Sequence, residues 1–441
     1  KNTRVVRLEQ NYRSTANILN AANAVIENNA DRMGKQLWTE GHDGEPIQLY
    51  TAYNEQDEAR FVVGRIEDCV DKGGVRSEIA ILYRSNAQSR VFEERLMQCG
   101  MPYRVYGGLR FFERAEIKDA LAYLRLTRNR DDDASFERVV NQPPRGIGGR
   151  TVEAIRQRAR DDRCSLWQAA ISMVNEKLLA ARACNAVMVF LQLIDELSTG
   201  LDKLTLGEQV EHVMQPSGLV DHFAREKGEK GQTRLENLQE LVNAAQEYEA
   251  DPDSGMDALS EFLAHASLEA GEGQADAWED CVQLMTLHSA KGLEFPLVFL
   301  CGLEEGLFPH QRSVAAPGKL EEERRLCYVG ITRARQQLVL SYAERRRLFG
   351  SETYCIPSRF IDEIPRALIE EIRPRPGISL PRGSRPAGSA GIHATAAGGL
   401  RLGQHVHHQK FGDGVVTNCE GQGSHARVQV NFSTAGSKWL V

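Results

Sequence analysis

Arg13, Arg333 and the run from Thr286 to Phe295 are the parts of the sequence whose residue types could bind a phosphate chain. Each lies in a short polar segment at the edge of an apolar strand or helix pattern, and neither arginine has an acidic residue within three positions. Arginine presents a planar fork of donors that matches phosphate oxygens. The run adds a glycine, a lysine and a carboxylate. A fold that brings these distant segments together would hold a polyphosphate between its parts.

The first segment, Leu8–Ser14, indicates the end of a strand, a polar turn and the start of a helix for which Ser14 is the expected N-cap. A helix N-terminus presents free N–H groups and positive partial charge, which favours phosphate. Arg13 adds its donors there, and Tyr12 offers an aromatic face for a base. The alternative is an ordinary helix start with a salt-bridging arginine, and this segment alone leaves both open.

The second segment follows a buried strand pattern that ends at Thr286 and re-enters an apolar strand after Pro296. Thr286 and His288 can donate hydrogen bonds to phosphates, and Gly292 allows the backbone to approach a ligand closely. Glu294 could accept a hydrogen bond from a ribose hydroxyl. A histidine with a structural role only is the alternative for His288.

The third segment belongs to a predicted helix over residues 320–335, in which charged residues are paired at i,i+3 and i,i+4. Arg333 lies at the end of this helix, after Thr332 and before the small Ala334. An arginine supplied from a neighbouring domain stabilises charge on a transferring phosphoryl group. A solvated charge ladder on the helix surface is the alternative.

The elements that must position these residues follow two patterns. Residues 1–107 and 281–372 alternate between strand and helix patterns, which predicts a parallel sheet with helical crossovers. Residues 108–280 lie between these two stretches. From about Glu113 to Leu268 they show helix patterns almost without interruption. We therefore expect an α/β domain split by an all-α insertion, with the glycines at 107–108 and 271–273 as hinge candidates. The strands expected in the α/β part are Val5–Leu8, Ile47–Ala52, Ile79–Tyr83, Tyr103–Tyr106, Val282–Thr286, Leu297–Leu300 and Gln337–Ser341.

The C-terminal part changes composition. Residues 373–399 are rich in Pro, Gly, Ser and Ala, which is typical of a flexible linker. Residues 400–441 contain short strands separated by glycine turns, which predicts a small SH3/Tudor-like β-barrel that is cut short at Val441.

Composition excludes several classes of protein. The 441 residues include 41% hydrophobic and 26% charged residues, as in ordinary globular proteins, and they contain neither a membrane-spanning run nor a signal peptide. The nine cysteines have no C-x-x-C spacing, so we expect free thiols and a cytoplasmic location. The net charge of −7 argues against a nucleic-acid partner, but local basic clusters near the three segments favour one.

Together the three segments resemble motifs of superfamily 1 helicases of the UvrD, PcrA and Rep type. Gln10–Ser14 resembles motif IV, Thr286–Phe295 resembles motif V and Tyr328–Ala334 resembles motif VI, and the resemblance covers essentially the whole chain. It implies that the α/β part is the family's second RecA-like domain and that the protein uses ATP and Mg²⁺ to unwind DNA in the 3′-to-5′ direction during repair. The implied nucleotide-binding residues are Tyr12 on adenine, Glu294 on the ribose, Gly292 in the same loop, and Arg13 and Arg333 on the γ-phosphate, with Arg333 as the arginine finger.

The same resemblance implies the contacts with DNA and with proteins. Thr286 and His288 would lie near the single strand, and the helical insertion resembles the mobile 2B domain. The residues expected at the duplex are Arg145, Gly146, Gly148, Arg150 and Thr151, in a glycine loop that would open a helix at Thr151. Residues Gly228–Leu235 form a second loop-to-helix site of this kind. The C-terminal module implies a protein partner such as RNA polymerase or nucleotide-excision-repair factors.

The sequence contains no G-x-x-x-x-G-K-[ST] phosphate loop. The family places that loop and the Mg²⁺ ligands in the first RecA-like domain, so we expect them upstream of Lys1 and expect this chain alone to be inactive. Two alternatives stay open. One is a non-catalytic adaptor that binds nucleic acid or a transcription complex. The other is the helicase subunit of a helicase–nuclease, although no cluster of nuclease carboxylates follows residue 335.

Overall fold

The computed structural model describes residues 9–29, 36–271, 275, 279–316, 318–348 and 351–372, and in the tail 405–408, 410, 412–420, 427–432 and 436–440. The chain falls into two compact units, residues 1–376 and 377–441, which are described separately here. The expected strand Val5–Leu8 and the whole of the expected linker, residues 373–399, lie outside the described residues.

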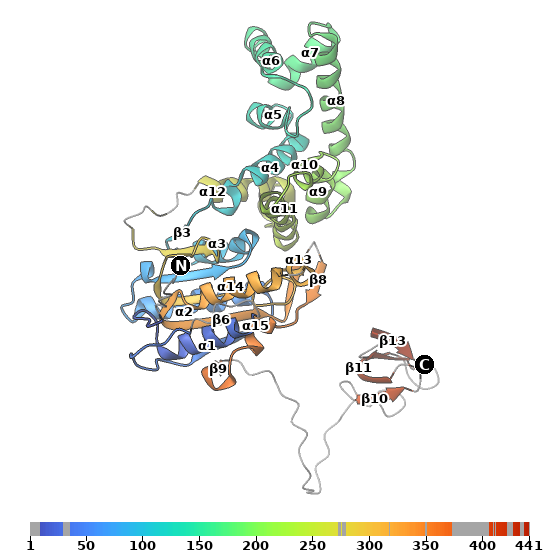
Figure 1. Cartoon of the computed structure of the whole chain (residues 1–441). Coiled ribbons are helices and arrows are strands. Elements are labelled where there is room, and N and C mark those ends of the chain that lie inside the picture. The colour runs from blue at the N-terminus through green and yellow to red at the C-terminus, as the bar shows by residue number, and fades with distance from the viewer. Residues whose placement is uncertain are drawn as a thin grey trace, which may run out of the picture. The chain divides into compact units, whose positions relative to one another are not determined.

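A parallel sheet forms the centre of the α/β part of the first unit (Figure 1). Its strands are β1 (Ile47–Ala52), β2 (Ile79–Tyr83), β3 (Tyr103–Val105), β4 (Val282–Thr286), β5 (Phe295–Leu300), β6 (Ala334–Ala343) and β9 (Ile369–Glu371). They pair in the order β3-β4-β2-β5-β6-β1-β9, and every pairing is parallel. The α/β sheet predicted from the sequence is therefore confirmed, and β9 is an edge strand that the sequence did not predict.

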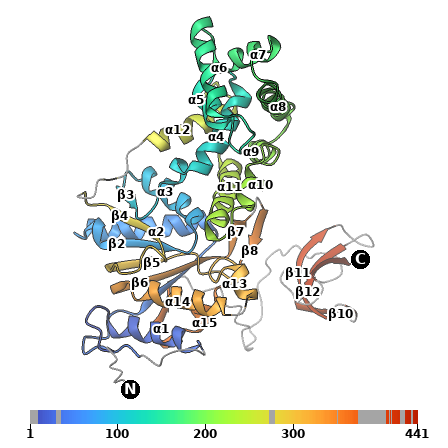
Figure 2. The same ribbon diagram turned by 45° about the horizontal axis from the view of Figure 1, so that its top comes forward.

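Helices cover both faces of this sheet, which explains why β2 is buried at every position. On one face α1 (Ala16–Glu27), α14 (Lys319–Ile331) and α15 (Arg359–Asp362) pack against Ala80, Leu82 and Leu340 (Figure 2). On the other face α2 (Glu55–Asp71) and α3 (Ser89–Gln98) pack against Ile79, Ile81 and Phe299. The predicted cap of α2 is present, because the Asn54 side chain accepts a hydrogen bond from the N–H of Asp57 at 2.9 Å.

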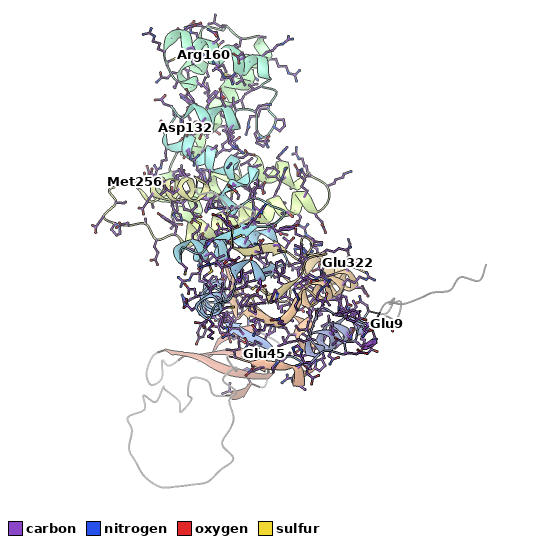
Figure 3. All side chains as sticks on the ribbon, turned by 90° about the vertical axis from the view of Figure 1, so that its left-hand side faces the viewer. Glu9, Glu45, Asp132, Arg160, Met256 and Glu322 are labelled. Carbon is purple, nitrogen blue, oxygen red and sulfur yellow. The ribbon has the colours of Figure 1, made fainter. Side chains whose placement is uncertain are left out.

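The chain between β3 and β4 is helical throughout its described secondary structure, as predicted. Its helices are α4 (Ala115–Arg128), α5 (Asp133–Val139), α6 (Gly149–Asp162), α7 (Leu166–Asn175), α8 (Ala181–Ser198), α9 (Leu206–Met214), α10 (Leu219–Ala224), α11 (Glu229–Glu247) and α12 (Ala258–Gly271). These helices share a hydrophobic core of their own, separate from the two cores that flank the sheet. Figure 3 shows Asp132 and Arg160 in the part of this region that lies away from the sheet.

Two helix boundaries differ from the prediction. The helix predicted over 320–335 ends at Ile331 with Thr332 as its C-cap, because the chain leaves the helix to enter β6, whose first residue Ala334 pairs with Phe295. Helix α1 starts one residue later than expected, with Thr15 rather than Ser14 at the N-cap. Ser14 does not cap the helix, because its hydroxyl donates to the carbonyl oxygen of Ala334 at 2.7 Å.

A buried ion cluster joins the sheet to a hairpin made of β7 (Arg345–Leu348) and β8 (Ser351–Tyr354). Arg346 donates to Glu58 at 2.6 Å and to both carboxylate oxygens of Glu304 at 2.7 and 2.8 Å. The side chains of both glutamates are 1% exposed. Further bonds from Ser341 and from the N–H groups of Gly302 and Ala343 complete the cluster. Every carboxylate oxygen involved is thus satisfied, as buried charges require.

The described residues of the second unit form four antiparallel strands in the order β10 (His405–His408), β11 (Gly412–Glu420), β12 (Arg427–Phe432) and β13 (Gly436–Leu440). These are the short strands that the sequence predicted, and the described residues form an antiparallel sheet with an irregularity between Val416 and Asn418.

The eight cysteines whose side chains are described are free thiols, as expected, and Cys301 and Cys327 are among the buried ones. No helix in the described part of the chain has the length and apolar character needed to span a bilayer.

Candidate functional site

Thr286 and His288, at the start of the second polar segment, lie at the carboxyl edge of the sheet. The first polar segment, the Glu294 end of the second and the end of the third meet at the amino edge, where β5 and β6 begin. They line an open pocket of about 380 Å³, formed by Gln10, Asn11, Tyr12, Arg13, Glu294 and Arg335. Glu294 immediately precedes β5, and Arg333 immediately precedes β6. The structure therefore brings together residues 10–13, 294 and 335, which the sequence separates by some 300 positions.

The turn before α1 is held by Ser14 and by Asn11, to which the sequence reasoning gave no role of its own. The side-chain oxygen of Asn11 accepts hydrogen bonds from the N–H groups of Arg13 at 2.7 Å and Ser14 at 2.9 Å. The hydroxyl of Ser14 and the N–H of Thr15 bond to the carbonyl oxygens of Ala334 and Arg335. An asparagine that accepts from the backbone two residues ahead is a recognised turn signal, and it could have identified Asn11.

Tyr12 presents its ring to solvent. The residue is 86% exposed, and its hydroxyl donates to the side-chain oxygen of Gln10 at 2.7 Å. An exposed aromatic ring held beside a polar pocket is a surface on which a planar base can stack. The adenine-stacking role of Tyr12 stays a prediction.

Arg13 and Glu294 form an ion pair across the pocket, although 281 positions separate them in the sequence. Their side chains are 32% and 42% exposed, so the pair is partly screened by solvent. The acidic partner that Arg13 lacks locally is therefore supplied by the second segment. Glu294 keeps accessible oxygen surface, which a ribose hydroxyl could reach.

Arg333 lies in the turn between α14 and β6 and is 8% exposed. Its guanidinium donates to the carbonyl oxygens of Val329 at 3.0 Å and Leu293 at 2.7 Å, and to the hydroxyl of Thr332 at 3.2 Å. Burial, and then the nearby charge of Arg13, lower the pKa of Arg333. Among the described lining residues, Arg13 and Arg335 face one carboxylate, that of Glu294, and Arg333 lies beside Arg13 without lining the pocket. This positive balance favours an anionic ligand.

Gly292 has a φ of +93°, and a Cβ added there would meet no atom within 4 Å. Only the backbone conformation, and not crowding, therefore requires glycine at this position. Gly292 belongs to the segment that leads from the carboxyl end of β4 to the amino end of β5.

A second cavity, of about 560 Å³, opens at the opposite, carboxyl edge of the sheet. We call it the groove. It is lined by Arg84, Ser85, Asn86, Gly228, Glu229, Gln232, Thr233, Glu236, Thr286, His288, His310, Arg312, Ser313, Ala316 and Lys319. The predicted residues Thr286 and His288 lie here, together with the second predicted loop-to-helix site, where α11 begins after Gly228. Partial burial, and then the charge of Arg84, lower the pKa of His288.

The predicted glycine loop lies in the helical region. The side-chain oxygen of Asn141 accepts hydrogen bonds from the N–H groups of Arg145 at 2.8 Å and Ile147 at 3.1 Å, and this fixes the loop. Gly146 has a φ of +81°. Helix α6 begins at Gly149 with Gly148 as its N-cap, two residues before the expected start at Thr151.

The two arginines of this loop point in different directions. The guanidinium of Arg145 bonds to the carbonyl oxygens of Pro143 at 3.0 Å and Ser217 at 2.7 Å and lies 5.6 Å from the centre of the Tyr123 ring. Arg150 is exposed, as are Gly146 and Gly148. Arg145 therefore packs into the helical region in this structure rather than lying on the loop surface as expected.

Comparison with known proteins agrees with this geometry. Residues 6–345 match the UvrD-like helicase C-terminal domain, and residues 402–441 match the PcrA/UvrD tudor domain. The chain is 58% identical over 437 residues to DNA helicase II of Escherichia coli, across 99% of this chain and 60% of that protein. It is 42% identical over 458 residues to the ATP-dependent DNA helicase PcrA of Bacillus subtilis, across 100% of this chain and 62% of that protein.

The chain thus spans about three fifths of the length of these curated relatives. The residues matched to the helicase domain include all three polar segments, from Gln10 to Arg335, which form the sites at the two edges of the sheet. The chain therefore belongs to the family of UvrD-like helicases, of which it carries the C-terminal domain and the tudor domain.

Proposed function

We propose that this chain is the second motor domain of an ATP-dependent DNA helicase that moves 3′ to 5′ along single-stranded DNA and acts in DNA repair. The observation that carries the proposal is the pocket at the amino edge of the sheet, where Tyr12, Arg13 and Glu294 meet beside Arg333. A base, a ribose and a phosphate chain need an aromatic face, an acceptor and guanidinium donors respectively. The pocket offers all three.

In this proposal ATP binds between the pocket and a first RecA-like domain that supplies the phosphate loop and the Mg²⁺ ligands. Tyr12 stacks on adenine, and Glu294 accepts from the ribose. Arg13 and Arg333 donate to the γ-phosphate and stabilise the charge that develops during its transfer. Glu294 would contact both Arg13 and the ribose. Nucleotide binding would therefore replace some of the contacts between Arg13 and Glu294 with contacts from each residue to the ligand.

The groove at the carboxyl edge is the proposed site for single-stranded DNA. Thr286 and His288 line it with Arg84 and Lys319, whose side chains suit backbone phosphates. We propose that the backbone of Gly146 and Gly148, with Arg150 and Thr151, contacts the duplex at a junction. The C-terminal sheet would bind a protein partner, for which the family resemblance implies RNA polymerase or nucleotide-excision-repair proteins. A cytoplasmic location fits this function.

The first test is ATP hydrolysis with and without single-stranded DNA, measured for this chain, for a separately produced first RecA-like domain, and for their mixture. We expect hydrolysis only in the mixture, because the γ-phosphate donors and the phosphate loop then share one site. Turnover by the chain alone would contradict the proposal. An inactive mixture whose parts demonstrably associate would favour the adaptor hypothesis, which needs DNA or protein binding but no hydrolysis.

The glycine loop gives a second test. We expect Arg150→Ala to weaken binding to a single-strand/duplex junction and to reduce the slope of log affinity against log salt by about 1, because one phosphate contact is lost. Binding to a single strand should change little. Fluorescence anisotropy over a salt series measures both substrates.

Arg160, which is exposed near the other end of α6, provides the matched control for Arg150. Arg160→Ala should leave junction binding unchanged. Arg145→Ala should instead lower the free energy of unfolding, by about 1–3 kcal/mol, because it leaves the carbonyl oxygen of Ser217 without its donor. If Arg150→Ala weakened binding to the junction and to the single strand equally, this loop would have no specific role at the duplex.

A further inference from the structure

Helix α14 connects the two edge sites. The sheet is parallel, so the chain leaves β5 at the carboxyl edge, where the groove lies, and must return to the amino edge to begin β6. Helix α14 makes this return. Its 13 residues extend about 20 Å at 1.5 Å per residue. Glu323 lies near the start of the helix, and Arg333 lies two residues after its end.

Glu323 fastens the start of α14 to the wall of the groove. Arg84 donates to both oxygens of Glu323, from Nε at 3.0 and 3.2 Å and from Nη2 at 2.8 Å. The N–H of His310 and the hydroxyl of Ser313 also donate to this carboxylate, each at 3.2 Å. Arg84, His310 and Ser313 all line the groove, whereas Glu323 does not. One buried carboxylate of α14 therefore gathers three residues of the groove wall.

The Arg84–Glu323 pair is the tightest of these contacts. The Glu323 side chain is 4% exposed and that of Arg84 is 17% exposed. Burial alone would raise the pKa of Glu323, but the bidentate bond and the charge of Arg84 hold it below its ordinary value. Arg84 has one charge to share, and a phosphate in the groove would compete with Glu323 for its donors.

We propose that Glu323 is a positioning residue that couples the occupancy of the groove to the placement of Arg333. The inference rests on the proposed function, which assigns the groove to single-stranded DNA and Arg333 to the γ-phosphate. A phosphate that engages Arg84 loosens its hold on Glu323 and changes the position of α14. The helix carries that change to the turn at Thr332, whose hydroxyl and neighbouring carbonyl oxygens hold the Arg333 guanidinium. Coupling of this kind needs two sites and one element that both of them bias.

The test uses the whole chain with oligothymidylate as the probe. Hydrogen exchange of residues 328–335 is measured with and without the probe, for the wild type, Glu323→Gln and the control Glu322→Gln. Glu322 is the matched control because it lies on the same helix and pairs only locally with Arg325 in the described contacts. The Glu322 side chain is 59% exposed.

We expect the probe to change exchange at 328–335 in the wild type and in Glu322→Gln by at least about fivefold, the low end of typical coupling. In Glu323→Gln we expect the probe to bind while this response disappears, since Arg84 keeps its charge but the phosphate no longer competes with the Glu323 carboxylate for its donors. A residue with only a packing role would lower stability without separating binding from the response. Joined to its first RecA-like domain, Glu323→Gln should also lose DNA stimulation of ATP hydrolysis by a similar factor.

Each failure has a distinct meaning. If the wild-type chain does not bind oligothymidylate, the assignment of the groove is wrong and the coupling falls with it. If the chain binds but 328–335 does not respond, or if Glu323→Gln responds like the wild type, the coupling alone is overturned. Should Glu323→Gln fail to fold, Arg84→Lys keeps the charge but loses the bidentate fork. It is then expected to reduce the response in the same direction, and a full response would overturn the inference.

Discussion

Arg333→Ala is expected to lower the rate of ATP hydrolysis by about 10³-fold or more when the chain is combined with a first RecA-like domain. Arg333 is buried beside Arg13 with no carboxylate bonded to its guanidinium among the described contacts, so its charge is available to a phosphoryl group. Single-turnover and steady-state rates with saturating single-stranded DNA measure the effect. Binding of a non-hydrolysable ATP analogue should weaken far less, because the developing charge is largest in the transition state.

Arg333→Lys is the matched control for this prediction. Lysine keeps the positive charge but lacks the planar fork of donors with which Arg333 reaches the carbonyl oxygens of Val329 and Leu293, so we expect it to recover only part of the rate. Circular dichroism and thermal unfolding should show that both variants are folded. A rate for Arg333→Ala within tenfold of the wild type would contradict the assignment of Arg333 to the γ-phosphate.

Arg346→Leu is expected to destabilise the first unit by about 3–5 kcal/mol, the range measured when one member of a buried ion pair is removed. Arg346 is the only described cation bonded to Glu58 and Glu304, and both carboxylates are almost completely buried. Its loss leaves two charges without a partner beneath the β7–β8 hairpin. Urea unfolding of the chain, followed by circular dichroism, measures the change.

The neighbouring Arg345 provides the control for this experiment. Its side chain is 48% exposed, and it pairs with Glu352 at 3.7 Å and lies 4.6 Å from the Tyr354 ring. Arg345→Leu should therefore cost less than about 1 kcal/mol, as exposed pairs usually do. If the two variants unfolded at the same urea concentration, the buried cluster would contribute little to stability.

The elements whose patterns are local could be predicted from the sequence. Strand β2 matched its prediction residue for residue, because a strand covered on both faces reads as an unbroken apolar run from Ile79 to Tyr83. The end of α14 could not be predicted in this way, since the charge pattern continues to Arg335. Residues Ala334 and Arg335 belong to β6 because Ala334 pairs with Phe295, a partner 39 positions away.

The direction of a side chain was the hardest feature to predict. Arg145 and Arg150 look alike in the sequence, but Arg145 turns inward because Ser217, 72 residues away, offers it a carbonyl oxygen. The pairing of Arg13 with Glu294 also depends on tertiary structure. Motif resemblance placed Arg13, Glu294 and Arg333 on one site, whereas Arg84 and Glu323 carry no motif and became visible only through their contacts.

The helical region has one more consequence, which follows from where it enters and leaves the sheet. Strands β3 and β4 are parallel neighbours, so the whole region from residue 106 to 281 occupies the place of a single crossover connection. Deleting it would require a substitute of a dozen residues or more, because a tight hairpin cannot join parallel strands. Besides these two adjacent chain connections, α11 is held to α3 by ion pairs from Arg90 to Glu240 at 2.6 Å and to Glu247 at 2.8 Å, so rotation of the region about the line through its connections must break these pairs. Translation away from the sheet would also stretch both connections at once.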